Sequence, residues 1–215
     1  TAMTSTDKNF DRLSKIAYES QFLLHGPMPE GVHWVGSDRQ KLRFQLLLKI
    51  VFEHNKSKET SIADVGCGYG ALAEYIKQHA SSKRLQYFGY DISEQLINYC
   101  HDNINYSWSD FKVGKSPDTK VDYCVMSGTY NLAMTSSVQK WEDYVFSCLN
   151  DCWKQTQKLM IFNLQIATVA YISKGEIFYA SKRKTLQKCN LLFGPTEIVH
   201  HRSLSKDAMF IVKRV

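Results

Sequence analysis

Several common signals are missing from this chain of 215 residues, and each absence excludes a class of protein. No apolar run approaches the roughly 20 residues that a membrane-spanning helix needs. No basic segment followed by an apolar one opens the chain, as a secretory leader would require. Thr1-Ala2-Met3 resembles an expression remnant ahead of a native start. Repeats, low-complexity tracts and linkers are missing too, so we expect one cytoplasmic domain with no membrane partner.

The cysteines give no sign of a disulfide framework or a metal site. Cys148 and Cys152 are one helical turn apart, but no further pair of cysteines or histidines completes a zinc-binding set. We therefore expect reduced thiols and no metal. The six cysteines are Cys67, Cys100, Cys124, Cys148, Cys152 and Cys189.

Excess charge is missing from most of the chain. Residues 1–173 carry 18 basic and 18 acidic side chains, whereas residues 174–215 carry nine basic and three acidic ones. The net charge of +6 therefore lies entirely in the last 42 residues. A solvated face explains such a bias in most proteins, and a partner that bears phosphates or carboxylates is the alternative.

Strand-length and helix-length apolar patterns alternate along the chain, which is typical of a parallel sheet covered on both faces. We predict an α/β, doubly wound, mostly parallel seven-stranded Rossmann-like sheet with an antiparallel edge hairpin. Residues 1–55 form an N-terminal helical cap and residues 56–215 the core. The expected helices span 6–24, 37–54, 70–80, 93–100, 138–155 and 181–189. The expected strands span 60–65, 85–90, 104–109, 121–126, 158–162, 197–201 and 208–213.

The most informative stretch is the run Asp64-Val65-Gly66-Cys67-Gly68-Tyr69-Gly70, which joins the first expected strand to a helix. Glycines there remove Cβ atoms at a sharp turn, so a ligand can lie against bare backbone. Asp91 ends the next apolar run, where a nucleotide ribose would offer two hydroxyls. Two other interpretations are open. Gly66-x-Gly68-x-x-Ala71 also fits the looser NAD fingerprint, and a glycine turn can be purely structural.

Asp64, the glycine spacing and Asp91 resemble motif I and the following acidic loop of class I S-adenosylmethionine-dependent methyltransferases. NAD loops usually carry an apolar residue where this chain has Asp64, and a carboxylate there suits an ammonium group better than a pyrophosphate. A group of small bacterial members carries a Gly-Trp…Gln…Arg-Phe pattern before motif I, and residues 25–44 resemble it. Residues 121–131 resemble the fourth strand and Ser-Gly-x-Phe-Asn loop of that group, and Phe162-Asn163-Leu164 and Phe178-Tyr179-Ala180 have counterparts there.

The chain also departs from that group. His33 replaces a glycine, Tyr130 replaces a phenylalanine, and Ser181-Lys182 stands where Asp-Pro is usual. A His-Asp-Tyr triplet reads His200-His201-Arg202 here. The last two departures lie in the expected substrate region, so the resemblance implies fold and cofactor rather than acceptor.

The resemblance implies that S-adenosylmethionine is the cofactor and assigns roles to individual residues. The glycines at 66, 68 and 70, with Cys67 between them, would lie against its methionine part. Asp64 would face its ammonium group, or else cap the next helix. Asp91 would accept from the ribose hydroxyls, since a carboxylate offers two acceptors to a vicinal diol.

Further residues follow from the same comparison. Ile92 would pack on the adenine, Asp110 would accept from its amino group with Phe111 beside the ring, and Ser127 and Gly128 would lie at the carboxyl ends of the strands. Trp34 would be a lid or a core residue. Arg43 would pair with the cofactor carboxylate, or form a surface salt bridge.

The acceptor side is less specific. No Asn-Pro-Pro-Tyr or Asp-Pro-Pro-Tyr follows the fourth strand, which argues against methylation of adenine amino groups, and no Pro-Cys pair there supports covalent attack on cytosine. Tyr130 and Asn131 are the expected substrate contacts. The candidate general bases are His33, Tyr130, His200 and His201.

We therefore predict methyl transfer to a nitrogen or oxygen of a small molecule. Three alternatives remain: a methyltransferase that acts on RNA or protein through the basic residues 174–215, a cofactor-binding module without catalysis, and a nicotinamide oxidoreductase. Nucleic acid is the less favoured partner, because few aromatic residues accompany the basic ones. The sequence carries no signal for an oligomeric state.

Overall fold

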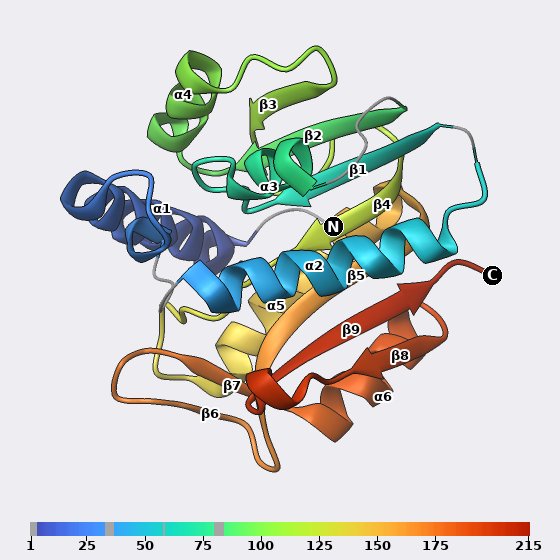
Figure 1. The fold of residues 1–215 in the computed structure, drawn as a ribbon. Helices are drawn as coiled ribbons and strands as arrows, with labels where there is room; N and C mark the ends of the chain where they lie inside the picture. Colours follow the sequence, from blue (N-terminus) through green and yellow to red (C-terminus); the bar gives the residue numbers. More distant parts are fainter. Residues whose placement is uncertain (1–3, 33–36, 58, 80–83) are drawn as a thin grey trace.

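The computed structural model describes residues 4–32, 37–57, 59–79 and 84–215, and these residues form a mixed β-sheet with helices on both faces (Figure 1). Five strands run parallel in the order β3-β2-β1-β4-β5. Their bounds are Thr60–Val65 for β1, Leu85–Asp91 for β2, Ser109–Val113 for β3, Val121–Met126 for β4 and Thr156–Ala167 for β5. The predicted doubly wound α/β fold is confirmed.

The C-terminal strands extend this sheet on the far side of β4. β9 (Asp207–Lys213) runs antiparallel to β5, and β8 (Thr196–Val199) runs antiparallel to β9, as the predicted edge hairpin requires. β7 (Phe178–Ser181) lies parallel to the last residues of β5, and β6 (Tyr171–Ile172) pairs with β7. The described sheet thus has nine strands, and the prediction of seven was too low.

The extra strands exist because β5 is longer than its apolar run. We expected it to end at Phe162, which pairs with Met126 at the end of β4. Beyond that point, Gln165 pairs with Tyr179 of β7 on one side and with Asp207 of β9 on the other. Asn163 and Gln165 break the apolar pattern but find hydrogen-bond partners inside the protein. In the sequence, a polar residue after an apolar run looks like the end of a strand, even when a distant partner lets it stay buried in the strand.

β3 was also misplaced by the sequence pattern, which put it at residues 104–109. Ile104 instead closes the preceding helix, where its N–H donates to Cys100 O (2.8 Å). Tyr106 and Trp108 stack on each other, with 5.0 Å between ring centroids. These loop aromatics have the β-prone side chains of a strand, and the sequence pattern therefore predicted one there.

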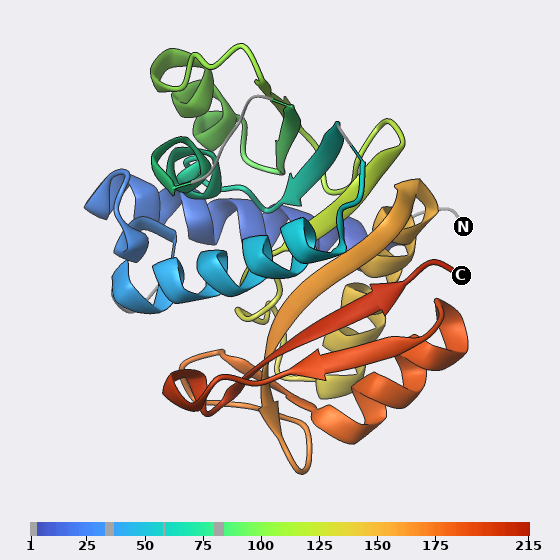
Figure 2. The same ribbon diagram turned by 45° about the vertical axis from the view of Figure 1, so that its right-hand side comes forward.

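Helices cover the two faces of the sheet (Figures 1 and 2). One buried cluster joins α2, α3 and α4 to β1, β4 and β5, and the other joins α5 and α6 to the opposite face. No described helix is both long and apolar enough to cross a membrane. The helices are α2 (Ser37–His54), α3 (Ala71–His79), α4 (Glu94–Asn103), α5 (Val138–Gln155) and α6 (Lys182–Leu192), with short 3-10 turns η1 (Pro29–Val32) and η2 (Arg202–Leu204).

The first helix, α1 (Ser5–His25), spans the gap between the two helical layers. Its first turn is fixed by a capping box between Thr4 and Asp7, as both side chains bond to backbone N–H groups. Phe10 packs edge-on against Trp141 of α5, and Phe22 packs edge-on against Tyr99 of α4. α1 therefore bridges opposite faces of the sheet, whereas α2 packs into the core of one face. The division after residue 55 stays a prediction.

Candidate functional site

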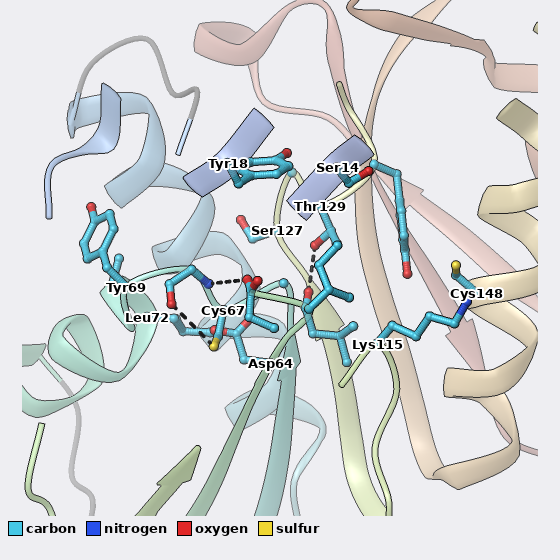
Figure 3. A pocket seen from close by; sticks show the side chains of 18 of the residues that line it. Ser14, Tyr18, Asp64, Cys67, Tyr69, Leu72, Lys115, Ser127, Thr129 and Cys148 are labelled. Atoms are coloured by element: carbon cyan, nitrogen blue, oxygen red, sulfur yellow. Dashed lines mark hydrogen bonds between the residues drawn. The ribbon is translucent and has the colours of Figure 1, made fainter. Parts of the chain in front are cut away.

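A cleft opens at the carboxyl ends of β1, β2 and β4, beneath α1, and its volume is about 910 Å³ with the open mouth included (Figure 3). Residues from the glycine turn, the strand ends, α1, α2 and α5 line it. The lining residues that the sequence had predicted as site residues are Asp64, Gly66, Cys67, Gly68, Asp91, Ile92, Ser127, Gly128 and Tyr130.

The glycine turn is tight because three left-handed residues follow β1. Gly66, Gly68 and Gly70 have φ angles of 77°, 58° and 84°, a region that side-chain-bearing residues rarely adopt. A Cβ on Gly66 would lie 2.5 Å from Thr129 Cγ2, so this glycine also admits the loop after β4. A Cβ on Gly70 would collide with Ile104 instead. Gly70 therefore serves the packing of α4, while Gly66 and Gly68 line the cleft.

Asp64 lies in the cleft with little solvent exposure (3%). The Tyr87 hydroxyl donates a hydrogen bond of 2.6 Å to its Oδ2. Burial raises the pKa of Asp64 to about 7, against the lowering effect of the Tyr87 hydrogen bond, and the nearby Asp91 charge raises it further. A carboxylate held at such a cost gains from any positive ligand group that reaches it.

Asp91 closes β2 and is tied to the glycine turn. Its Oδ2 accepts from Gly68 N (3.0 Å), and its Oδ1 accepts from Ser93 N (2.9 Å). Burial raises the pKa of Asp91, although both backbone hydrogen bonds lower it. Each carboxylate oxygen has a second lone pair, so the group can accept from a vicinal diol without losing its backbone partners.

These groups fit a cationic ligand with several hydrogen-bond donors and acceptors. Among the residues that the structure describes, neither Asp64 nor Asp91 lies in an ion pair. The cleft lysine, Lys115, is paired with Asp11 at 3.1 Å. The buried Ser127 hydroxyl, which faces the cleft between Tyr18 and the turn (Figure 3), has no hydrogen-bond partner in the described part of the chain. Buried groups of this kind usually bind a ligand or water.

Tyr130 lines the cleft, but its hydroxyl faces the protein. It donates to Met126 Sδ at 3.4 Å, while the Tyr130 carbonyl accepts from Trp141 Nε1 at 3.1 Å. Burial raises the pKa of Tyr130 well above its ordinary value. This environment disfavours the predicted role as a general base.

Arg43 and Asp110 lie elsewhere than the sequence predicted. Arg43 is buried beside Asp207, with Nη2 donating at 2.6 Å and Nε at 3.0 Å. Its charge is thus used inside the protein, neither for a ligand carboxylate nor at the surface. Asp110 is exposed near Lys112 (3.8 Å), because β3 begins at Ser109 and places it at the amino end of the strand. Lys115, unlike Asp110, lines the cleft.

Three further candidates serve the fold or lie outside the cleft. Phe111 is buried and packs on Tyr87, with 5.7 Å between ring centroids. Asn131 Oδ1 accepts from the Gln165 N–H (3.3 Å), and this joins the loop after β4 to β5. His200 is exposed at the end of β8.

The remaining histidine candidate and the lid residue need separate mention. His201 Nδ1 accepts from the Ser203 N–H (3.2 Å) in the turn before β9. His33 and Trp34 lie outside the described residues, so their predicted roles stay predictions.

Sequence reasoning missed the roof and the far wall of the cleft. The Tyr18 ring and Ser14 on α1 lie above the glycine turn in Figure 3. α1 is held there by Glu19, which accepts from the Ser93 hydroxyl (2.8 Å), and by Asp11, which accepts from the Tyr144 hydroxyl (2.7 Å) and Lys115. The sequence of α1 is that of an ordinary amphipathic helix, so it gives no sign of these contacts. Gln40, from the expected N-terminal cap, lines the cleft as well. The missed lining residues are Ser14, Tyr18, Phe44, Val65, Tyr69, Ala71, Leu72, Gly114, Lys115, Thr129, Trp141, Tyr144 and Cys148.

Known proteins share both the sequence motif and the fold. Residues 62–151 match a family model described as a methyltransferase domain. This segment contains the glycine turn, Asp91 and the loop after β4. Over these residues the chain is similar to the class I S-adenosylmethionine-dependent methyltransferases. The interpretation as a nicotinamide oxidoreductase or a purely structural turn is therefore set aside.

Individual relatives are distant. A Mycobacterium tuberculosis (strain ATCC 25618 / H37Rv) protein, Rv1506c, which is named as a methyltransferase, is 25% identical over 149 residues, which cover 68% of this chain and 89% of that protein. Magnesium protoporphyrin IX methyltransferase (ChlM) from Synechocystis PCC 6803, solved with bound SAM, superimposes with a TM-score of 0.63. The match covers 100% of this methyltransferase and 99% of that chain at 10% identity. The small RNA methyltransferase HEN1 gives a TM-score of 0.58 at 18% identity, over 81% of this chain and 25% of HEN1. At such identities the two structures are evidence for the fold alone.

Proposed function

We propose that this methyltransferase binds S-adenosylmethionine in the cleft beneath α1 and methylates a nitrogen or oxygen of a small-molecule acceptor. The observation that carries the proposal is the pair of buried carboxylates, Asp64 and Asp91, on either side of the glycine turn. Both are desolvated, and among the described residues neither has a cationic partner. A ligand with an ammonium group and a ribose diol satisfies both.

Each part of the cleft then has a task. Asp64 binds the ammonium group, Asp91 accepts from the ribose hydroxyls, and Ile92 packs on the adenine. The backbone at Gly66 and Gly68 leaves room for the methionine part. When bound, the cofactor supplies a methyl carbon that its sulfonium makes electrophilic. The protein aligns the acceptor for in-line attack and excludes water.

A small acceptor is favoured because α1 and α2 cover the cleft. Tyr18 comes from α1, Gln40 and Phe44 come from α2, and Tyr69 lies across from them with its hydroxyl 3.5 Å from Gln40 Oε1. These groups offer aromatic surface and neutral hydrogen-bonding atoms. No histidine lines the described walls of the cleft. An acceptor whose nucleophilic atom has a free lone pair at neutral pH suits such walls.

Two measurements test this proposal in order. Isothermal titration calorimetry with S-adenosylhomocysteine should show binding to one site per chain, and the absence of heat and of thermal stabilisation would contradict cofactor binding. Methyl transfer from labelled S-adenosylmethionine is then assayed against a size-fractionated metabolite extract. Label that appears only in macromolecular fractions would contradict the small acceptor.

An RNA acceptor is the second candidate, and one surface feature favours it. Six exposed cations in the C-terminal region take part in no ion pair among the described residues: Lys174, Lys182, Arg183, Lys184, Arg202 and Lys206. Phosphate contacts weaken steeply with salt. Retention of RNA at 50 mM salt that is lost at 200 mM would support this candidate, and no retention at either concentration would remove it.

A further inference from the structure

One buried carboxylate of β9 accepts hydrogen bonds from side chains of two other elements, α2 and β5. Asp207, at the start of β9, is 4% exposed. Its Oδ2 accepts from Arg43 of α2, from Asn163 Nδ2 (2.9 Å) and from Gln165 Nε2 (3.0 Å). Neither Asn163 nor Gln165 contacts the cleft. The network nevertheless reaches the cleft, through the other end of one of these amides.

Asn163 has its two amide ends fixed by different partners. Its Nδ2 donates to Asp207, and its Oδ1 accepts from Gly128 N at 2.6 Å. The carboxylate can only accept and the Gly128 N–H can only donate. A flipped amide would therefore lose both hydrogen bonds, inside a site where Asn163 is 2% exposed. The charge on Asp207 thus sets the orientation in which Asn163 offers its oxygen to Gly128.

Gly128 belongs to the wall of the cleft. It follows Ser127, whose buried hydroxyl has no hydrogen-bond partner among the described residues, and it has a φ of 77°. The next residue, Thr129, is tied to β1 by a hydrogen bond of 2.7 Å from its hydroxyl to the Val65 carbonyl. Without an acceptor for the Gly128 N–H, the loop after β4 keeps its Asn131 bond to β5 but loses the hydrogen bond that holds the wall between Ser127 and Thr129.

We infer that Asp207 is a positioning residue for the cofactor cleft, acting through Asn163 on the Gly128 N–H. The inference rests on the proposed function for its ligand. The positive charge of Arg43 balances the negative charge of Asp207, so the buried network of Arg43, Asn163 and Asp207 is neutral overall. Gln165 shares the same carboxylate oxygen but has no contact with Gly128, and it therefore provides a matched control.

A chemical swap tests the inference. Asn163→Asp places two carboxylates together, and Asp207→Asn lets the Asn163 amide turn, so each should lower the affinity for S-adenosylhomocysteine about tenfold. The double variant Asn163→Asp/Asp207→Asn restores an acceptor toward Gly128 and a donor from position 207, and it should bind within about threefold of the original protein. Gln165→Leu should leave the affinity unchanged.

Several results would overturn the inference. One is that the single variants bind S-adenosylhomocysteine as tightly as the original protein. Another is that the affinity of the double variant falls by the product of the two single losses. The third is that Gln165→Leu loses as much affinity as the single variants. Thermal unfolding is followed for all four variants, because a merely structural network would lower stability in each without the recovery of affinity in the double variant.

A measurement on the unaltered protein separates this inference from the proposed function. The Gly128 amide should exchange with solvent at least about a hundredfold more slowly than an exposed amide, as expected for a buried hydrogen bond. Exchange at the exposed rate would contradict the positioning role, even if the variants fail to fold. If the Gly128 amide is protected from exchange but S-adenosylhomocysteine does not bind, the proposed function is refuted, whereas the hydrogen bond between Asn163 and Gly128 is supported.

Discussion

Asp64 at the end of β1 and Asp207 at the start of β9 are both buried aspartates, but their surroundings differ. Asp207 receives N–H groups from Arg43, Asn163 and Gln165 and forms an ion pair of 2.6 Å. Asp64 receives the Tyr87 hydroxyl and lies in a cleft, with its pKa raised to about 7. A carboxylate whose charge is matched inside the protein supports the fold. A buried carboxylate without a cationic partner among the described residues can instead bind a positively charged ligand.

The largest expected effect concerns the matched carboxylate. Asp207→Ala leaves Arg43 buried without its charge partner, and we expect it to lower the free energy of unfolding by about 3–5 kcal/mol. Glu197→Ala, which breaks an exposed ion pair with Lys213, should cost about 0–1 kcal/mol. Chemical denaturation measures both, and equal losses would contradict the comparison.

The unmatched carboxylate should behave in the opposite way. Asp64→Asn should weaken S-adenosylhomocysteine binding on the order of 100-fold, because a charge-assisted contact to the ammonium group is lost. The raised folded-state pKa means that the contribution of Asp64 to stability is complete below about pH 4 and lost as the pH rises through 7. The uncharged variant should therefore be more stable than the original protein at pH 8.

A control for this substitution is Asp110→Asn, which alters an exposed carboxylate outside the cleft. It should leave the affinity unchanged. A loss as large as that of Asp64→Asn would restore the adenine contact that the sequence predicted for Asp110.

Two glycines with similar φ angles allow the cost of backbone strain to be measured separately from the cost of a steric contact with a neighbouring side chain. Gly26 and Gly66 have φ angles of 67° and 77°, but a Cβ on Gly26 meets none of the described residues within 4 Å, whereas one on Gly66 meets Thr129. Gly26→Ala should cost about 1 kcal/mol, and Gly66→Ala about 2–3 kcal/mol. Adding Thr129→Ala should recover part of the second loss, and no recovery would show that the contact is unimportant.

The pH dependence of binding sharpens the comparison further. Protonated Asp64 cannot attract an ammonium group, so the affinity for S-adenosylhomocysteine should fall by up to about tenfold for each pH unit below 7. Calorimetry between pH 5.5 and 8 measures the slope. In Asp64→Asn the profile should be flatter, and an unchanged profile would assign the titration to another group, such as Asp91.

The smallest effect is expected at Tyr130. Its hydroxyl donates to Met126 Sδ, so Tyr130→Phe should change stability by less than about 1 kcal/mol. Methyl transfer, once an acceptor is found, should proceed at a similar rate. A rate loss above tenfold would instead support the catalytic role predicted from sequence.

The sequence predicted the glycine turn and the strand ends around the cleft well because their signals are local. The turn from Asp64 to Gly70 and the strand that ends at Asp91 are contiguous, and parallel strands bring their carboxyl ends together without further information. The prediction failed for Asp110, where aromatic residues after α4 imitated a strand and shifted β3. It failed for Arg43 because its partner, Asp207, is 164 residues away along the chain.

By itself, the sequence determined the alternation of strands and helices, the bare-backbone turn and the two carboxylates beside it. Hydrophobic period and glycine placement act over a few residues and can be read in order. Tertiary structure alone decided that α1 roofs the cleft, that β5 continues past its apolar run, and that Asp207 reaches Gly128 through Asn163. These features depend on which distant polar groups satisfy one another once water is excluded, and no local pattern encodes that pairing.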